Sequence, residues 1–330
     1  MKKILSALIF LAFAACASAQ YKDRPYGPPA IPLSIATTGT WQFTTPMLVL
    51  GGENLQITGS SAFNPAGAWL GSFTYTESPY IPYGLTSFSF NNLQGLTGPY
   101  STQTVIATGT ISYPTLVYCG GAFTCVTAVT SGLVTAPQLN YTGGAMSLTG
   151  YSFSFPSLVS INGALSFNLS TTGSSVYMPL LNYVNGSITS LNMGVASSLS
   201  FPSLTYVLGS SFNISGTNLS TISIPNLISA PSLGYTLNSG LGNLTSVVLG
   251  TIGTLKNIGG NINIAGQKLT QASVDAILAI LASLDGTNGT VSWGTGKTLT
   301  INGGTNAAPS SSGSTSMATI VARGGTVTHN

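Results

Sequence analysis

The chain has 330 residues, and only 4% of them are Asp, Glu, Lys or Arg, against about a quarter in an ordinary soluble domain. A hydrophobic share of 43% excludes a disordered polar chain, which is poor in apolar residues. The formal net charge is +3, but Lys2 and Lys3 lie in an expected leader, which leaves 8 − 2 = 6 basic residues against 5 acidic ones. This balance excludes a typical nucleic-acid-binding protein, which clusters Lys and Arg against phosphates.

The first twenty residues, MKKILSALIFLAFAACASAQ, have the three parts of a signal peptide. A positive start precedes an apolar segment at residues 4–13, which is too short to span a membrane. The Ala-x-Ala sequence predicts cleavage between Ala19 and Gln20. A minor alternative is lipidation at Cys16, because the three residues before it resemble a bacterial lipoprotein box. We therefore expect an exported protein, extracellular or at the cell surface.

Composition divides the rest of the chain into three parts. Residues 20–45 are rich in proline and predict an extended leader or tether. Residues 46–265 are expected to form repeats, and residues 266–330 a small domain of mixed helix and strand. With the signal peptide at residues 1–19, this gives four segments, none of which contains a membrane span.

Between Pro46 and residue 265 the pattern P-x-L-x(4)-G recurs, with the proline sometimes replaced. The intervals between its leucines are 23, 23, 19, 23, 23, 23 and 28 residues. A period of this length is typical of solenoids, in which each repeat buries its apolar face only against its neighbours. The repeat leucines are Leu93, Leu116, Leu139, Leu158, Leu181, Leu204, Leu227 and Leu255.

One copy, PSLVSINGALSF, shows what the pattern predicts. Pro156 starts an extended segment, Leu158 points inward, and Gly163 is expected to make a tight turn with positive φ. Leu165 and Phe167 then alternate with small residues, as in a strand with one buried face. The predicted fold is mainly β, a parallel β-solenoid of ~23-residue repeats, similar to a leucine-rich repeat, with a small α/β C-terminal cap. Its stacked parallel strands are expected at residues 123–125, 146–148, 165–167, 188–190, 212–214 and 262–264.

The repeats resemble extracellular leucine-rich-repeat and related β-solenoid surface proteins, as in SGTNLSTISIPNL at residues 215–227. The resemblance covers roughly residues 46–264 and implies a cell-surface adhesion protein. Asn218 follows Ile214 by four residues, where the leucine-rich repeat has three, so we favour the more general β-solenoid.

After Gly266 the pattern changes to that of a cap. Thr270 predicts the start of a helix that continues to Asp285 and stops at Gly286. A strand at residues 298–301, a flexible loop at 304–316, a short helix at 316–323 and a closing strand follow. Residues 268–330, with LTQASVDAILAIL and ATIVARGGTVTHN, resemble a module at the C-terminal ends of phage tail-fibre and other virion-associated proteins. This resemblance implies a receptor-binding protein of a virion.

Cys119 and Cys125 are the two cysteines that remain after cleavage at Ala19. Aligned with the other copies, both stand at inward positions. A disulfide between them is one expectation and two buried thiols the other, because a six-residue separation allows a bridge only if the turn is tight. Their spacing is not that of a metal site.

The middle of the chain has no catalytic groups of the usual kind. No Asp, Glu, Lys, Arg or His occurs from Ser78 to Leu255, and general acid–base catalysis needs such a side chain. We expect a protein that is not an enzyme, has no cofactor and no catalytic or metal-binding residues, and works by adhesion or recognition.

The expected partner is a cell-surface glycan or protein receptor, because a face without charge binds through shape, hydrogen bonds and stacking. Tyr75, Tyr80 and Tyr83 are the predicted contact residues, since tyrosine offers a rigid amphipathic surface. A tail-fibre-like receptor-binding protein is an alternative. A self-assembling surface-layer or matrix component is another, because near-zero net charge favours self-association.

Overall fold

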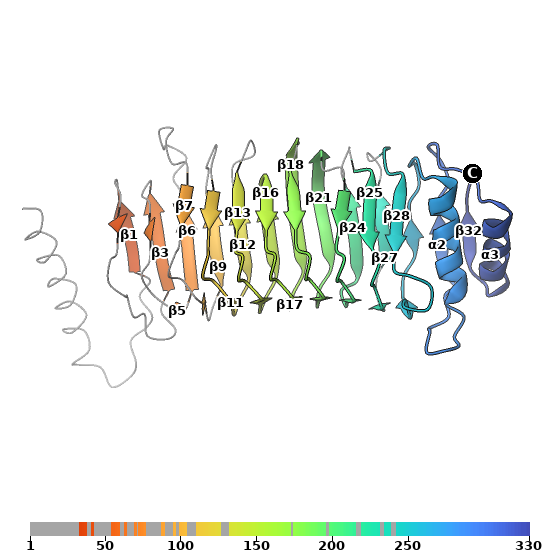
Figure 1. The fold of residues 1–330 in the computed structure, drawn as a ribbon, viewed down its shortest axis with the longest axis horizontal. Coiled ribbons are helices and arrows are strands. Elements are labelled where there is room, and N and C mark those ends of the chain that lie inside the picture. The colour runs from red at the N-terminus through yellow and green to blue at the C-terminus, as the bar shows by residue number, and fades with distance from the viewer. Residues whose placement is uncertain are drawn as a thin grey trace, which may run out of the picture.

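The computed structural model describes isolated segments between residues 33 and 103 and then residues 110–126, 132–172, 174–195, 198–215, 219–231, 234–238 and 242–330. In these residues the chain forms an elongated stack of coils that ends in helices (Figure 1). Neighbouring coils are joined by parallel strand pairs. The predicted class, a mainly β parallel solenoid with C-terminal helices, is confirmed.

One side of the stack is a 13-stranded parallel sheet, in which each coil supplies one strand. Its strands are β1 (Leu33–Thr37), β3 (Asn54–Gly59), β6 (Ser72–Thr76), β9 (Tyr100–Gln103), β12 (Phe123–Val126), β15 (Met146–Thr149), β18 (Leu165–Thr172), β21 (Ile188–Val195), β24 (Ser211–Ser215), β27 (Gly234–Asn238), β30 (Ile262–Asn263), β31 (Thr298–Thr300) and β32 (Thr326–Thr328). The sheet thus begins inside the segment expected as a leader and continues through the segment expected as a cap.

A second side is a nine-stranded sheet of very short strands. They are β5 (Trp69–Leu70), β8 (Gly95–Leu96), β11 (Tyr118–Cys119), β14 (Tyr141–Thr142), β17 (Ser160–Ile161), β20 (Tyr183–Val184), β23 (Tyr206–Val207), β26 (Ser229–Ala230) and β29 (Asn257–Ile258). Several of these strands lie along one long edge of the stack in Figure 1.

The third side consists of a five-stranded and a three-stranded sheet. The five are β7 (Ser87–Ser89), β10 (Thr110–Ser112), β13 (Leu133–Thr135), β16 (Ser152–Ser154) and β19 (Ser175–Tyr177). The three are β22 (Ser198–Ser200), β25 (Thr221–Ile224) and β28 (Ser246–Leu249). A separate pair joins β2 (Trp41–Gln42) and β4 (Phe63–Asn64).

The register of the 13-stranded sheet follows the sequence period. The six strands predicted from the repeat all lie in this sheet and are all parallel. Cys125 is paired with Leu148, and Leu148 with Phe167, as the alignment of the copies predicts. Because a strand alternates its side chains between two faces, this register places the apolar residues of successive coils one behind another in the core.

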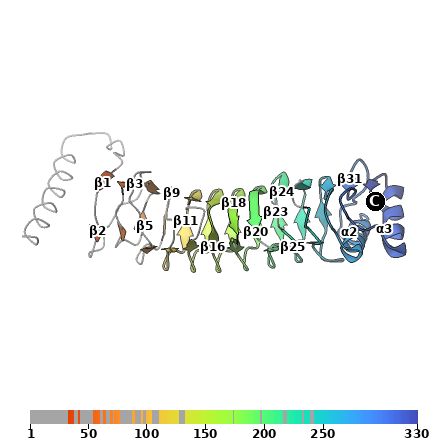
Figure 2. The same cartoon turned by 90° about the horizontal axis from the view of Figure 1, so that it is seen from above.

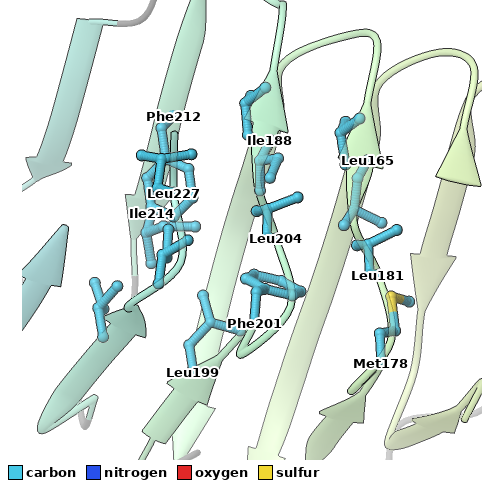
Figure 3. Close-up of a cluster of buried hydrophobic side chains, with 14 of the residues drawn as sticks. Leu165, Met178, Leu181, Ile188, Leu199, Phe201, Leu204, Phe212, Ile214 and Leu227 are labelled. Carbon is cyan, nitrogen blue, oxygen red and sulfur yellow. The ribbon is translucent and has the colours of Figure 1, made fainter. Parts of the chain in front are cut away.

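The proline of the repeat stands in a turn between the third side and the nine-stranded sheet. In six coils the repeat leucine donates its N–H to the carbonyl three residues earlier, for example Leu158 to Phe155 at 3.2 Å and Leu181 to Met178 at 3.2 Å. Proline fits the second position of such a turn because its fixed φ is the required one. The residues on both sides of each turn are buried, as Figure 3 shows for Met178 and Leu181.

The glycine after the repeat leucine has a different role from the expected one. Gly144 and Gly163 do not have positive φ. A Cβ atom at Gly163 would instead stand 2.5 Å from the backbone nitrogen of Ala145 in the preceding coil, and one at Gly144 would stand 2.7 Å from that of Ala122. The glycine is required because adjacent coils approach too closely here for any side chain.

The 19-residue and 28-residue intervals between repeat leucines arise because the segments that join the strands at the corners of the coil differ in length. In the 19-residue copy, β16 starts six residues after the start of β15, whereas β13 starts ten residues after the start of β12. This corner is turned at Gly150, with φ of 153°. In the 28-residue copy, extra residues stand before and after β28, where Gly250 and Gly253 have positive φ. The strands themselves keep their register.

At the C-terminal end, helices replace the strands of the third side. Helix α2 (Gln271–Ser283) contacts β28, and α3 (Ser311–Ala322) contacts α2; Figure 2 shows both at the end of the stack. Thr270 caps α2 as predicted, by accepting from the Ser273 N–H. The expected flexible loop at residues 304–316 is wrong, because α3 starts at Ser311 behind the cap residue Ser310.

Candidate binding surface

The tyrosines predicted as contact residues lie where no side chain is described. Tyr75 belongs to β6, and its backbone position pairs with Ile57 and Thr102. Tyr80 and Tyr83 are outside the described residues, as are Cys16, Ala19 and Gln20. The structure therefore does not test these positions.

A row of tyrosines that the sequence reasoning missed lies on the nine-stranded sheet. Tyr118, Tyr141, Tyr183 and Tyr206 each occupy the first position of a short strand and are paired in register across the coils. The second position of each strand is buried, so the tyrosines point to the outer side. Tyr206 is the most exposed of them, at 38%.

The spacing of the coils brings the first two tyrosines of the row into contact. The rings of Tyr118 and Tyr141 are stacked, with centroids 5.3 Å apart and planes at 7° to one another. This distance is close to the separation of neighbouring strands, about 4.8 Å. The two rings therefore stand side by side along the axis of the stack.

One position in the row has no tyrosine. Ser160 pairs with Tyr141 on one side and with Tyr183 on the other. Its coil also carries Asn162, whose amide oxygen accepts a hydrogen bond of 2.9 Å from the amide nitrogen of Asn185. Both asparagines are exposed. The serine thus leaves a gap between two tyrosines, and an exposed pair of amides follows it along the coil.

The residues just before the row add apolar and amide surface. Val117, Asn140 and Val159 are exposed, and their backbones form a ladder: Asn140 N–H donates to Val117 O at 2.8 Å and Val159 N–H to Asn140 O at 2.9 Å. Exposed aliphatic side chains beside tyrosines form a surface suited to stacking contacts.

Electrostatically this surface is neutral. The charged side chains in the described part of the chain start at Lys256, and all lie at the C-terminal end. Lys297 donates to Ile258 O at 3.1 Å, and partial burial lowers its pKa. Asp285 is exposed, and hydrogen bonds from Thr287 lower the pKa of its carboxyl group. None of these groups lies on the strands that carry the tyrosines.

The outer row of the 13-stranded sheet is also uncharged but has smaller side chains. Thr124, Ser147, Ser166 and Thr189 pair in register on its outer side. They alternate with buried residues, such as Phe123. Short hydroxyl side chains offer little area to a ligand, so we place the candidate site on the tyrosines.

Both cysteines are buried, which confirms their predicted inward orientation. Cys119 lies in the nine-stranded sheet and Cys125 in the 13-stranded sheet, and no disulfide joins them. Sγ of Cys119 contacts the carbonyl oxygens of Gly121 at 3.6 Å and Ala122 at 3.7 Å. Burial raises the pKa of the Cys119 thiol to about 11. Such a thiol is a packing residue and a poor nucleophile.

The tyrosine row could have been found in the sequence. The second residue after the repeat leucine is Tyr in four copies, as in TLVYC, QLNYT, LLNYV and SLTYV. The predicted contact residues instead come from the N-terminal part of the chain, where aromatic residues are dense. The outward positions of the same alignment contained the signal.

In the described part of the chain, no group of three or more His, Cys, Asp or Glu side chains is placed to hold a metal ion. None of the described helices has the length and apolar character to cross a membrane. Comparison of the chain with protein-family models, with curated proteins and with solved structures finds no match.

Proposed function

We propose that the chain is an exported, non-catalytic recognition protein that binds a neutral surface ligand, a glycan or a receptor, through the nine-stranded sheet. The observation that carries this proposal is the row formed by Tyr118, Tyr141, Tyr183 and Tyr206 on an uncharged face. Tyrosine combines a rigid apolar ring with a hydroxyl group and loses little conformational entropy on binding.

The absence of charge on these coils decides the class of ligand. An anionic or cationic ligand would lose its hydration on this face and gain no ion pair in return. A neutral ligand with apolar faces and hydroxyl groups loses less hydration free energy. It can stack on the tyrosine rings and form hydrogen bonds with the asparagine amides. The same absence favours binding over catalysis, because no acid–base pair is available from Ser78 to Leu255.

The proposal is tested with the mature chain on an array that holds both neutral and anionic glycans and glycosylated receptor ectodomains. We expect binding to neutral glycans or to ectodomains that carry them, and mass spectrometry should show the bound glycans intact. Binding confined to anionic glycans, no binding, or cleavage of the glycan would contradict the proposal.

The C-terminal segment favours one setting for this activity. Because residues 268–330 resemble modules of tail-fibre and other virion proteins, a receptor-binding fibre protein of a virion is the second candidate. Tail and baseplate genes beside the gene for this chain would support it, and a neighbourhood of cell-envelope genes would favour the cell-surface setting.

A further inference from the structure

We propose that the gap at Ser160 is a subsite that holds one sugar ring of a neutral glycan between Tyr141 and Tyr183. This inference rests on the proposed function and names the ligand class and the place where it binds. It starts from the pairing of Ser160 with both tyrosines.

The spacing of the coils allows a ring at this gap but not between the stacked rings of Tyr118 and Tyr141. Tyr118 and Tyr141 have ring centroids 5.3 Å apart, which leaves no space between them. Tyr141 and Tyr183 stand two coils apart, or about 9.5 Å at the backbone. A ring inserted between two others needs roughly 7 to 8 Å, because carbon atoms in contact are about 3.5 to 4.0 Å apart. The space available exceeds this requirement, and the difference accommodates a saturated sugar ring, which is thicker than a flat aromatic ring.

Polar groups border the gap in a way that suits sugar hydroxyls. The Ser160 side chain forms the base of the gap, and Asn162 and Asn185 stand two residues after Ser160 and Tyr183. Their mutual hydrogen bond uses one N–H and one acceptor, while an amide carries two N–H groups and two acceptor positions. Each asparagine thus has further capacity to donate to or accept from a hydroxyl group.

The charge pattern selects a neutral sugar. No charged residue stands on the coils that carry Tyr141, Ser160 and Tyr183. A glycan made of hexoses or N-acetylhexosamines therefore fits, whereas one that carries sialic or uronic acids finds no counter-charge.

A second serine, which lies just beyond Tyr206 in the same sheet, provides a matched control. Ser229 pairs with Tyr206 on one side and with Asn257 on the other. It therefore has a tyrosine on one side only and forms no gap between two rings. Replacing Ser160 with Tyr completes the row and fills the proposed subsite, whereas the same replacement at Ser229 leaves the subsite open.

The experiment measures affinity for the neutral oligosaccharide bound most strongly on an array of hexose and N-acetylhexosamine glycans. Ser160→Tyr and Tyr141→Ala should each weaken binding roughly tenfold or more, as the loss of an aromatic stacking contact predicts. Ser229→Tyr should bind as the unchanged chain does. Tyr177→Ala should as well, because Tyr177 is 55% exposed and lies in the five-stranded sheet, away from the tyrosine row.

The outcomes separate the two proposals. If the unchanged chain binds the glycan and Ser160→Tyr binds equally well, the subsite is wrong and the proposed function stands. Equal losses in Ser160→Tyr and Ser229→Tyr also overturn the subsite, because they would show a general effect of bulk on this face. If the unchanged chain binds no neutral glycan, the subsite is wrong. The proposed function is then wrong only if the chain also binds none of the receptor ectodomains on the array described under the proposed function.

Discussion

At the scale of single residues, the place of a side chain in the coil decides its environment more than its chemical type. Leu180 and Leu181 are neighbours in the chain, yet Leu180 is 51% exposed and Leu181 is fully buried. The turn at Pro179 separates them, because it directs the second leucine into the core and leaves the first on the surface.

We expect Leu181→Asp to prevent the coils around it from folding, because it buries a carboxylate that has no partner. Leu180→Asp is the control and should change the free energy of unfolding by less than about 0.5 kcal/mol, as is usual for surface substitutions. Circular dichroism during urea denaturation measures both. Similar losses in the two variants would mean that the register of this turn is wrong.

The buried thiol of Cys119 predicts a dependence on alkaline pH. Its pKa is about 11 in the folded chain against 9.0 for an ordinary thiol, so the folded state keeps the proton to higher pH. The stability that Cys119 contributes is fully present below pH 9 and is lost as pH rises toward 11, about 2 to 3 kcal/mol in total.

Cys119→Val is the matched variant, since valine stands at the same position of the coil in Val184 and Val207. Urea denaturation between pH 8 and 11 should show a steeper loss of stability in the unchanged chain than in this variant. Parallel pH profiles would contradict the burial of the thiol.

Sequence alignment was sufficient for the residues whose position follows from the period. It placed Cys119 opposite Leu96, and Cys125 opposite Leu148, where the structure has them. The alignment gave the wrong role for Gly163, because a glycine in a sequence does not indicate why glycine is required there. Positive φ and close approach of another coil favour the same residue, and only the three-dimensional stack distinguishes them.

At the scale of secondary-structure elements, the coil is a set of short strands joined by corners, and the corners absorb the irregularities. Helix α3 shows why the sequence was less informative at the C-terminus. Its first six residues are SSGSTS, a composition that predicts a loop. The Ser310 cap and the Asp275 carboxylate, which accepts from Ser310 N–H at 3.0 Å, stabilise the start of the helix instead.

The close contact of neighbouring coils can be tested at Gly163. Gly163→Ala should destabilise the stack by more than about 2 kcal/mol, because the new methyl group overlaps backbone atoms of Ala145. Gly253→Ala is the control: its Cβ would have open space, and only its φ of 87° costs energy, about 1 kcal/mol. Denaturation of both variants gives the comparison, and equal costs would count against the close approach.

One arginine side chain binds the C-terminal end of α2. The Arg323 guanidinium donates to Leu284 O at 3.0 Å and to Ala282 O at 2.6 Å, at the C-terminal end of α2. Cations are favourable there because the carbonyl groups carry partial negative charge.

Arg323→Ala should therefore speed hydrogen exchange in α2 and lower the stability of the cap by about 2 kcal/mol. Lys268→Ala, which removes an exposed bond to Asn243, should have little effect. Unchanged exchange in α2 would mean that Arg323 contributes nothing to the cap.

At the scale of the whole molecule, the parallel stack separates charge from the proposed binding surface. The charged residues described lie in and next to the helical end, while the coils with the tyrosine row have none. A stack of this kind presents the same outward position once per coil. The period could be predicted from the sequence, and so could the neutrality of the surface. The face that carries the proposed binding surface could not be predicted, because it depends on which outward-facing residues of successive coils lie beside one another.

The most direct test of this account is the salt dependence of binding. The dissociation constant for the best neutral glycan is measured by calorimetry at low and at high salt. Binding through tyrosine rings and amides predicts a constant that stays within about twofold, because no ion pairs are screened. A loss of affinity of about tenfold or more would show that charged groups carry the contact, and that result would contradict recognition through the neutral coils.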